Sequence, residues 1–298
     1  MRDSVRRDEG VLMPAAGDAP APASWESAVA WLVAQPGQTD LVRACYYDPP
    51  LAVAARRYHA SEEWAAVRAM LPTSGGLALD LGAGNGIASY ALARDGWRVV
   101  AVEPDPSAVV GAGAIRALAA SEGLDITVLE GAGERIDLPS ASVDLVFARQ
   151  VLHHANDLRQ LCREAARVLR PGGMFVAARE HVLSRASDLP AFHRGHPLHR
   201  LYGGEHAYVL RDYRTALRDA GLVILRELRP LESVVNFAPL TRASLRGELQ
   251  ARLRRLPMGS AAARLLDHER IYDAARWLAA RVDDRPGRLF TFVCKRPA

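Results

Sequence analysis

The stretch from Leu77 to Gly86 reads LALDLGAGNG and restricts the possible folds more than any other part of the sequence. A short apolar run ends in Asp80, and glycines follow at every second position. This pattern predicts a buried parallel strand, a glycine loop and then a helix over Ile87–Arg94. Glycines accept unusual φ values and let a ligand approach without Cβ contacts, and a helix N-terminus offers unpaired N–H groups. The stretch therefore predicts a binding site for a polar or anionic ligand group.

The next predicted strand, Trp97–Val102, ends in Glu103. An acid at that strand end can accept hydrogen bonds from both ribose hydroxyls of a nucleoside. The dinucleotide fingerprint G-x-G-x-x-G, counted from Gly82, would require a glycine at position 87, where the chain has Ile87. The glycine spacing therefore disfavours an NAD-dependent oxidoreductase, although a nucleoside-containing ligand is still expected.

The spacing D-x-G-x-G-x-G from Asp80 resembles motif I of the class I S-adenosylmethionine (SAM) dependent methyltransferases. The later series VDLVFARQVLHH…VLRPGGMFVAARE resembles further motifs of their small-molecule members, of the ubiquinone and menaquinone biosynthesis type. The resemblance implies an α/β, Rossmann-like seven-stranded sheet, with SAM as cofactor. The strands expected after Glu103 are Ile126–Glu130, Val143–Ala148, Met174–Glu180, Leu222–Leu228 and Arg288–Lys295.

The resemblance also assigns cofactor-binding residues. Gly131–Glu134 matches the family's G-D-A-E segment, but Ala132 replaces the acid whose side chain binds the adenine amino group. Backbone groups at Gly133 and Glu134 could still read the adenine edge, and a solvated Glu134 is an equal alternative. The expected cofactor contacts are Asp80, Gly82, Ala83, Gly84, Gly86, Glu103, Pro104, Gly133, Glu134 and Arg149.

Methyl transfer to a hydroxyl or an acidic carbon also needs a general base, and an imidazole is suited to that task near neutral pH. His153 and His154 follow the fourth predicted strand and are the candidate bases. The alternative is that one histidine caps the next helix while the other packs in the core. The candidate substrate contacts are Tyr46, Tyr58, Glu180, His181 and His206.

The expected reaction is O- or C-methylation of a small molecule, which basic residues and imidazoles suggest is acidic or polyhydroxylated. The alternatives are a SAM-fold enzyme of different chemistry and a non-catalytic SAM-binding protein. A metal site is not expected, because Pro197 interrupts any helix that would align His193, His196 and His199.

Three regions are expected along the chain. Residues 1–24 are rich in proline, alanine and glycine and predict a disordered tail. Residues 25–70 predict helices that form a lid over the cofactor or, alternatively, simply pack on the sheet. Residues 71–298 form the SAM-binding domain, with a helical insertion at about 232–285 that caps the pocket or forms a homodimer surface.

Composition limits the partners further. The net charge is only +4, and Lys295 is the single lysine among 38 basic residues, with no concentrated basic stripe. A nucleic-acid partner is therefore not expected. The three cysteines lack metal spacing and fit a reducing compartment. No apolar stretch approaches the roughly 20 residues needed to span a bilayer, so a cytoplasmic location without membrane association is expected.

Overall fold

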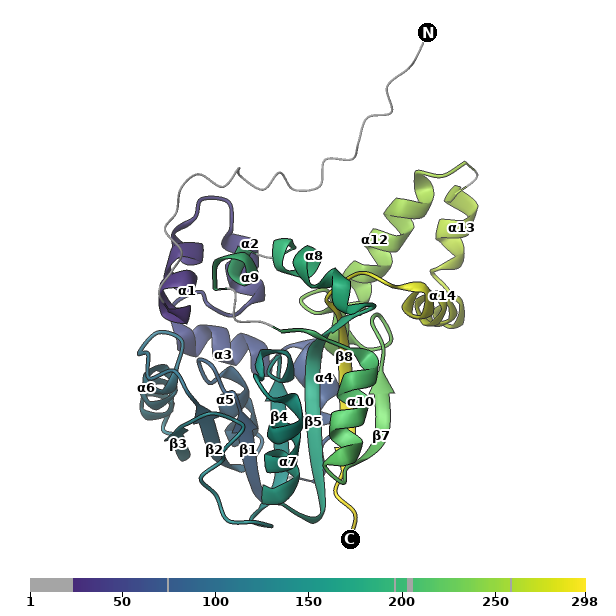
Figure 1. Cartoon of the computed structure of the whole chain (residues 1–298). Coiled ribbons are helices and arrows are strands. Elements are labelled where there is room, and N and C mark those ends of the chain that lie inside the picture. The colour runs from purple at the N-terminus through teal and green to yellow at the C-terminus, as the bar shows by residue number, and fades with distance from the viewer. Residues whose placement is uncertain (1–23, 74, 196, 203–205, 258) are drawn as a thin grey trace.

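A computed structural model shows a mixed eight-stranded sheet (Figure 1). The glycine loop follows one of the inner strands of this sheet. The structure describes residues 24–73, 75–195, 197–202, 206–257 and 259–298. Seven strands lie in the order β3-β2-β1-β4-β5-β8-β7, and β6 pairs with β5. The first five are parallel, and β8 runs antiparallel between β5 and β7. The strands are β1 Leu77–Leu81, β2 Arg98–Glu103, β3 Ile126–Glu130, β4 Val143–Arg149, β5 Leu169–Leu183, β6 Tyr208–Val209, β7 Val223–Leu228 and β8 Arg288–Lys295.

This topology confirms the predicted α/β, Rossmann-like fold, to which β6 adds a short strand. Because β1 to β5 are parallel, their carboxyl ends meet at one edge of the sheet, where ligands of open α/β folds bind. Asp80, Glu103, Arg149 and Glu180 all lie at or near that edge.

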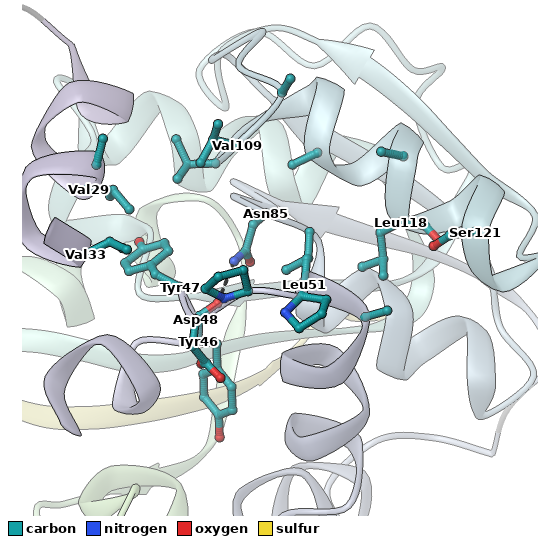
Figure 2. Close-up of a pocket in the computed structure, with 18 residues that line it drawn as sticks. Val29, Val33, Tyr46, Tyr47, Asp48, Leu51, Asn85, Val109, Leu118 and Ser121 are labelled. Atoms are coloured by element: carbon teal, nitrogen blue, oxygen red, sulfur yellow. Dashed lines mark hydrogen bonds between the residues drawn. The ribbon is translucent and has the colours of Figure 1, made fainter. Parts of the chain in front are cut away.

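Four helices precede the sheet: α1 Trp25–Ala34, α2 Thr39–Ala44, α3 Leu51–His59 and α4 Glu62–Arg68. Ser24 caps α1, as predicted, by accepting a hydrogen bond from Ser27 N–H at 3.2 Å. Helices α1 and α2 lie beyond the carboxyl ends of the strands, and α1 packs against α9 (Pro197–Tyr202) (Figure 1). A cavity of about 700 Å³ lies between α1, the segment Tyr46–Ala52 and α6 (Ala112–Glu122) (Figure 2).

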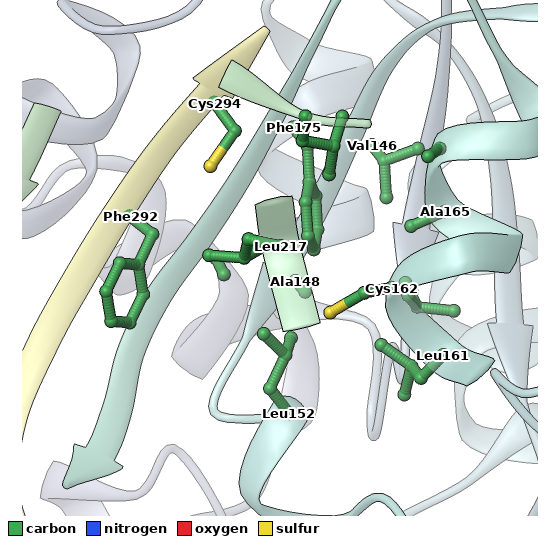
Figure 3. Packing of buried hydrophobic residues seen from close by; sticks show 14 of the residues in the cluster. Val146, Ala148, Leu152, Leu161, Cys162, Ala165, Phe175, Leu217, Phe292 and Cys294 are labelled. Atoms are coloured by element: carbon green, nitrogen blue, oxygen red, sulfur yellow. The ribbon is translucent and has the colours of Figure 1, made fainter. Parts of the chain in front are cut away.

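Helices cover both faces of the sheet, and the side chains of β1 alternate between them. Leu79 and Leu81 pack with α7 (Leu158–Val168) and α10 (Leu210–Asp219). Figure 3 shows this layer, with Cys162 of α7 and Leu217 of α10 around Phe175 of β5. Ala78 packs on the opposite face with α3, α4 and α5 (Ile87–Arg94), where Tyr58 and Trp64 are fully buried. The α/β/α arrangement holds the strand ends rigidly in place.

Four more helices lie between β7 and β8, within the predicted insertion: α11 Val234–Phe237, α12 Arg242–Arg254, α13 Gly259–Leu265 and α14 Glu269–Val282. Helix α11 packs against α4 and the sheet, whereas α12 and α13 pack on each other and project away from it (Figure 1). Trp277, Leu278 and Val282 of α14 are more than half exposed.

Several predicted boundaries are corrected. Proline favours the first turn of a helix, so Pro106 predicts a helix start, but α6 begins at Ala112, because the side chains of Asp105 and Ser107 bind backbone N–H groups and form turns there. The sequence from His181 to His206 predicts a long irregular segment, but the structure has α8 (Leu189–Arg194) and α9 there. The predicted tail, residues 1–23, lies outside the described residues. Among the described helices, none is both long and apolar enough to cross a bilayer.

Candidate functional site

The glycine loop forms an open cradle at the end of β1. Gly82 and Ala83 donate their N–H groups to Val102 O at 2.8 and 3.1 Å, which ties the loop to β2. Gly84 donates its N–H to Glu103 Oε2 at 2.7 Å. Its φ is +57°, and a Cβ built there would meet no atom within 4 Å. A ligand can therefore approach the backbone at Gly84.

The other two loop glycines are required by packing. A Cβ on Gly82 would lie 2.7 Å from Val151 Cγ1, and one on Gly86 would lie 3.1 Å from Ile115 Cγ1. The first contact places the loop directly beside the segment that follows β4. The first i to i+4 backbone hydrogen bond of α5 runs from the Tyr90 N–H to Gly86 O. The backbone N–H groups of Ile87–Ser89 lie before it, in the first turn of the helix, at the end that faces the loop.

Glu103 is buried at the edge of this cradle, with 7% of its surface exposed. Its second oxygen, Oε1, accepts the Asp105 N–H at 3.0 Å. A carboxylate offers about four lone-pair positions, so each oxygen keeps one for a ribose hydroxyl. Burial raises the pKa of Glu103 to about 7, so a small change in surroundings decides its charge at neutral pH. Pro104, the next predicted contact, is exposed.

Asp80 lies beneath the loop and is 1% exposed. Its Oδ2 accepts a 2.6 Å hydrogen bond from the Ser89 hydroxyl of α5. Burial raises the pKa of Asp80 to about 7, against the opposing effect of that hydrogen bond. Asp80 therefore joins β1 to α5 under the cradle.

The segment predicted to read adenine divides into an open and a packed part. A Cβ on Gly131 would meet no atom within 4 Å, and Ala132 is exposed. Gly133 instead faces Leu161 and Leu81, at 3.0 and 3.2 Å from its virtual Cβ. The Glu134 side chain accepts the Asn156 N–H at 3.0 Å and so holds the turn before α7, which leaves the backbone of Glu134 as the expected adenine contact. The space at Gly84 and Gly131 and the lone pairs of Glu103 fit an adenosyl group.

Arg149 forms an ion pair with Glu63, a residue that was not identified from the sequence alone. Its Nε donates to Glu63 Oε1 of α4 at 2.8 Å, and its Nη1 donates to Gln150 Oε1 at 3.0 Å. The guanidinium also lies 5.3 and 5.6 Å from the ring centroids of Tyr58 and Tyr46. Burial opposes ionisation of Arg149, but Glu63 outweighs it and keeps its pKa above the ordinary value.

Arg179 completes this network from β5, with a φ of +61°. It donates to Val235 O and Ala238 O of the insertion at 2.6 and 2.9 Å, and its Nε lies 3.8 Å from Glu63 Oε1. Tyr58 is fully buried and packs in the core, while its predicted contact with substrate stays a prediction. Tyr46, which is 6% exposed, packs edge-on against Tyr58.

His153 and Glu180 form a buried pair at the ends of β4 and β5. His153 Nδ1 lies 2.9 Å from Glu180 Oε2, and the carboxylate also accepts the N–H groups of Val151 and His153. Glu180 is fully buried and contacts His153, while its predicted contact with substrate stays a prediction. Burial lowers the pKa of His153 to about 3 and raises that of Glu180 to about 7. With Nδ1–H donating to the carboxylate, Nε2 is left as a proton acceptor.

Further rings surround this pair. The rings of His154 and His181 lie 4.3 and 4.7 Å from that of His153. Trp25 of α1 contacts His154 at 6.3 Å and thereby brings the N-terminal helices over the pair. His181 Nδ1 donates to Gly287 O at 2.7 Å. His206 is exposed, and its backbone N–H donates to His153 O at 2.8 Å.

Most of the predicted site residues therefore lie at the carboxyl edge of the sheet, but several of them hydrogen-bond to other residues of the chain. Glu63, Arg179 and Trp25 were not identified as site residues from the sequence, because their contacts are with residues far away along the chain. Only the polar pair Arg179–Glu180, directly after an apolar strand, could have indicated Arg179. Within the described ranges, no group of three or more His, Cys, Asp or Glu side chains is placed to hold a metal ion.

Comparisons with known proteins agree with this geometry. Residues 79–177 match the family described as Methyltransferase domain. A dimethylglycine N-methyltransferase from Parasynechococcus marenigrum is 38% identical over 104 residues, covering 34% of this chain and 36% of that protein. A ubiquinone biosynthesis O-methyltransferase from Methylobacterium is 29% identical over 157 residues, covering 51% of this chain and 62% of that protein. The chain therefore spans less than two thirds of the length of these two curated relatives.

A solved structure agrees at the level of the fold. The crystal structure of the cyclase SpnF has a TM-score of 0.53 and 19% identity, covering 82% of this chain and 81% of that one. Identity this low supports the fold and not the reaction. Residues 79–177 therefore match a methyltransferase domain, and the glycine motif and the strand order are those that the resemblance to class I, SAM-dependent methyltransferases implies.

Proposed function

We propose that this chain transfers a methyl group from SAM to the oxygen or carbon of a small molecule, with His153 as the general base. The observation that carries the proposal is the buried His153–Glu180 pair, 2.9 Å apart, directly after the Val151 that packs on the glycine loop. Bound SAM would supply the activated methyl group. Glu103 would hold the ribose of SAM, and the open space at Gly84 and Gly131 would let SAM contact the protein backbone there.

The histidine pair supplies what an acceptor hydroxyl requires. Burial keeps the imidazole of His153 neutral, so Nε2 can take the acceptor's proton. The Glu180 carboxylate fixes the tautomer through Nδ1 and stabilises the imidazolium that forms, as a carboxylate does beside a catalytic histidine. Glu180 is therefore a positioning residue, and His154 beside it would line the acceptor site.

In this proposal the N-terminal helices form a lid over the acceptor site. Trp25 of α1 contacts both His154 and Tyr47, at 6.3 and 6.4 Å between ring centroids. These contacts would exclude water from the acceptor, which strengthens the electrostatic interactions that align the reactants. An acceptor with an acidic or polyhydroxylated group fits the imidazole and arginine side chains at this edge.

The test combines SAM binding with turnover. Calorimetry should show SAM binding, and radiolabelled SAM should methylate a member of a panel of phenols, catechols, hydroxy acids and β-dicarbonyl compounds. His153→Asn should reduce kcat by about 10² to 10⁴ and leave the SAM affinity unchanged. SAM binding without turnover would favour the non-catalytic alternative, and a product other than S-adenosylhomocysteine would indicate different SAM chemistry.

The role of Glu180 needs a readout that a purely structural residue would not change. Glu180→Gln should move the acidic limb of the kcat pH profile, where the general base becomes protonated, and spare KM for SAM, because it alters the imidazole without touching the cofactor. If the variant has an unchanged pH profile and only a smaller amount of folded protein, Glu180 has a structural role and takes no part in the reaction.

We also propose a cytoplasmic location and a homodimer. All three cysteines, Cys45, Cys162 and Cys294, are free thiols, as expected in a reducing compartment. The exposed apolar side chains of α14 in the insertion would suit contact with a second copy. Light scattering of the purified chain tests the second proposal.

A further inference from the structure

We infer that the cavity between α1, Tyr46–Ala52 and α6 is a second ligand site, which takes an uncharged aliphatic molecule. Its volume of about 700 Å³ lies within the range of about 300–1,000 Å³ that small-molecule pockets occupy. Val29 and Val33 of α1 form one wall, and Ala114 and Leu118 of α6 form the opposite wall (Figure 2). The site therefore joins the N-terminal helices to the SAM-binding domain.

This cavity is distinct from the cofactor cradle. Among its lining residues only Asn85 belongs to the glycine loop, and neither Gly84 nor Glu103 takes part. Tyr46 contributes to the wall, but its ring points away from the cavity (Figure 2) and packs 5.2 Å from Tyr58. A ligand here would not occupy the positions expected for adenosine.

The charge in the cavity excludes ionic ligands. Among the described residues that line it, Asp48 is the only acidic or basic one, and both of its oxygens accept hydrogen bonds from Arg57, at 2.6 and 2.8 Å. Burial raises the pKa of Asp48, but the Arg57 hydrogen bond outweighs it, so the net direction is down. The carboxylate is therefore ionised and already paired. Arg57 already neutralises this carboxylate, so an ammonium would gain little from it, and an anion would meet no free cation in the lining.

The lining favours a flexible aliphatic chain with one hydroxyl. Five lining residues are alanines: Ala30, Ala52, Ala108, Ala114 and Ala117. Small side chains leave a smooth wall on which the CH₂ groups of an aliphatic chain can be buried from water. Ser121 donates its hydroxyl to Leu118 O at 3.0 Å and keeps lone pairs that can accept a hydrogen bond from an alcohol.

The mouth of the cavity is apolar as well. Val33 on α1 and Val109 before α6 both line it, and their side chains are 42% and 52% exposed. Exposed apolar side chains at a concavity are typical of a ligand site, and an aliphatic chain would cover both. The ligand would also contact α1 and α6 together, so its binding should stabilise the N-terminal helices against the domain.

The experiment uses Nile red, an uncharged dye that fluoresces in apolar sites, with the full chain. Decan-1-ol should displace the dye at a concentration at least tenfold lower than decanoate or decylammonium. Ala117→Trp fills the cavity from an exposed position on α6 and should weaken dye binding more than tenfold. Ala120→Trp, equally exposed on α6 but outside the lining, is the matched control and should bind like the wild type.

These readouts do not involve SAM, so they stand apart from the proposed methyl transfer. Equal dye binding in Ala117→Trp and Ala120→Trp would overturn the site. Displacement by decanoate as effective as by decan-1-ol would overturn the assignment to an uncharged ligand. A dimer by light scattering that Ala117→Trp alone dissociates would mean that a second copy of the chain covers this surface instead.

Discussion

Gly84 has open space in front of its α-carbon, and a substitution there can separate ligand contact from folding. We predict that Gly84→Val abolishes SAM binding, because the new side chain would occupy the cradle. A left-handed backbone costs an L-residue roughly 1–2 kcal/mol, which calls for a control with the same strain. Gly123 provides it, with a φ of +62° and no atom within 4 Å of its virtual Cβ, at the end of α6.

Calorimetry and urea unfolding of the two glycine variants give the comparison. Gly84→Val and Gly123→Val should lose similar stability, while only the former loses SAM. If both variants bind SAM with wild-type affinity, the glycine loop is not the cofactor cradle.

Glu103 is the second residue at which ligand contact can be isolated. Glu103→Ala should remove charge-assisted hydrogen bonds worth about 1.5–3 kcal/mol to the ribose. That loss corresponds to roughly ten- to more than a hundredfold weaker SAM binding. The 2′-deoxy analogue of SAM should bind the wild type more weakly than SAM does, and the variant should hardly distinguish the two ligands. An equal penalty in both proteins would exclude Glu103 from the ribose site.

At the scale of elements, Glu63 joins α4 to β4 and β5, and through Arg179 to the insertion. Glu63→Gln should destabilise the chain by about 3–5 kcal/mol, since two buried arginines would lose their shared carboxylate. Urea unfolding measures this effect. Glu269→Gln is the control: Glu269 pairs with Arg242 and Arg246 but its side chain is 63% exposed, so a loss of at most about 1 kcal/mol is expected. Equal losses would mean that the buried network is not a major contact between these elements.

The same elements show how far the sequence alone could predict the structure. The glycine spacing and apolar runs located β1 to β4 closely, because these patterns depend on local periodicity. The sequence over Leu51–Met70 predicts one amphipathic helix, but the helix breaks at Ser61, whose hydroxyl caps α4 by accepting the Trp64 N–H. No glycine or proline marks that break.

Strand β5 shows a similar limit. It was expected to begin at Met174, after the glycines, but it begins at Leu169. Gly172 N–H donates to Arg296 O, and Arg296 N–H donates to Gly173 O, so the C-terminal segment stabilises this extended backbone. Pairing across more than a hundred residues leaves no local trace. For the same reason the sequence indicated Arg149 and Glu180 but not that Glu63 and His153 bind them.

At the scale of the whole molecule, three buried carboxyls set the response of stability to pH. The pKa values of Asp80, Glu103 and Glu180 are each raised to about 7 by burial. In the unfolded chain they titrate near 4. A raised carboxyl pKa contributes stability that is present at low pH and is lost as pH rises through the folded value.

Buried histidines act in the opposite sense but in a different window. Burial lowers the pKa values of His153 and His154 to about 3, so their stabilising contribution is present above about 6.5, the unfolded value, and is lost as pH falls. Below pH 6.5 the two effects compete. Between pH 6.5 and pH 8 the histidines gain only the last part of their contribution, so the loss from the carboxyls is the larger change, which makes this window the informative one.

We therefore predict that the free energy of unfolding without SAM falls between pH 6.5 and pH 8, by roughly 1 kcal/mol for each of the three carboxyls. Urea unfolding at a series of pH values measures the slope. Glu103→Gln cannot ionise and should remove about a third of it, whereas Glu130→Gln, an exposed acid on β3, should leave the slope unchanged. A wild-type stability that stays flat or rises in this window would mean that the strand-end carboxyls are already ionised in the folded protein. The edge of the sheet would then carry its negative charge before any cation, including the sulfonium of SAM, arrives.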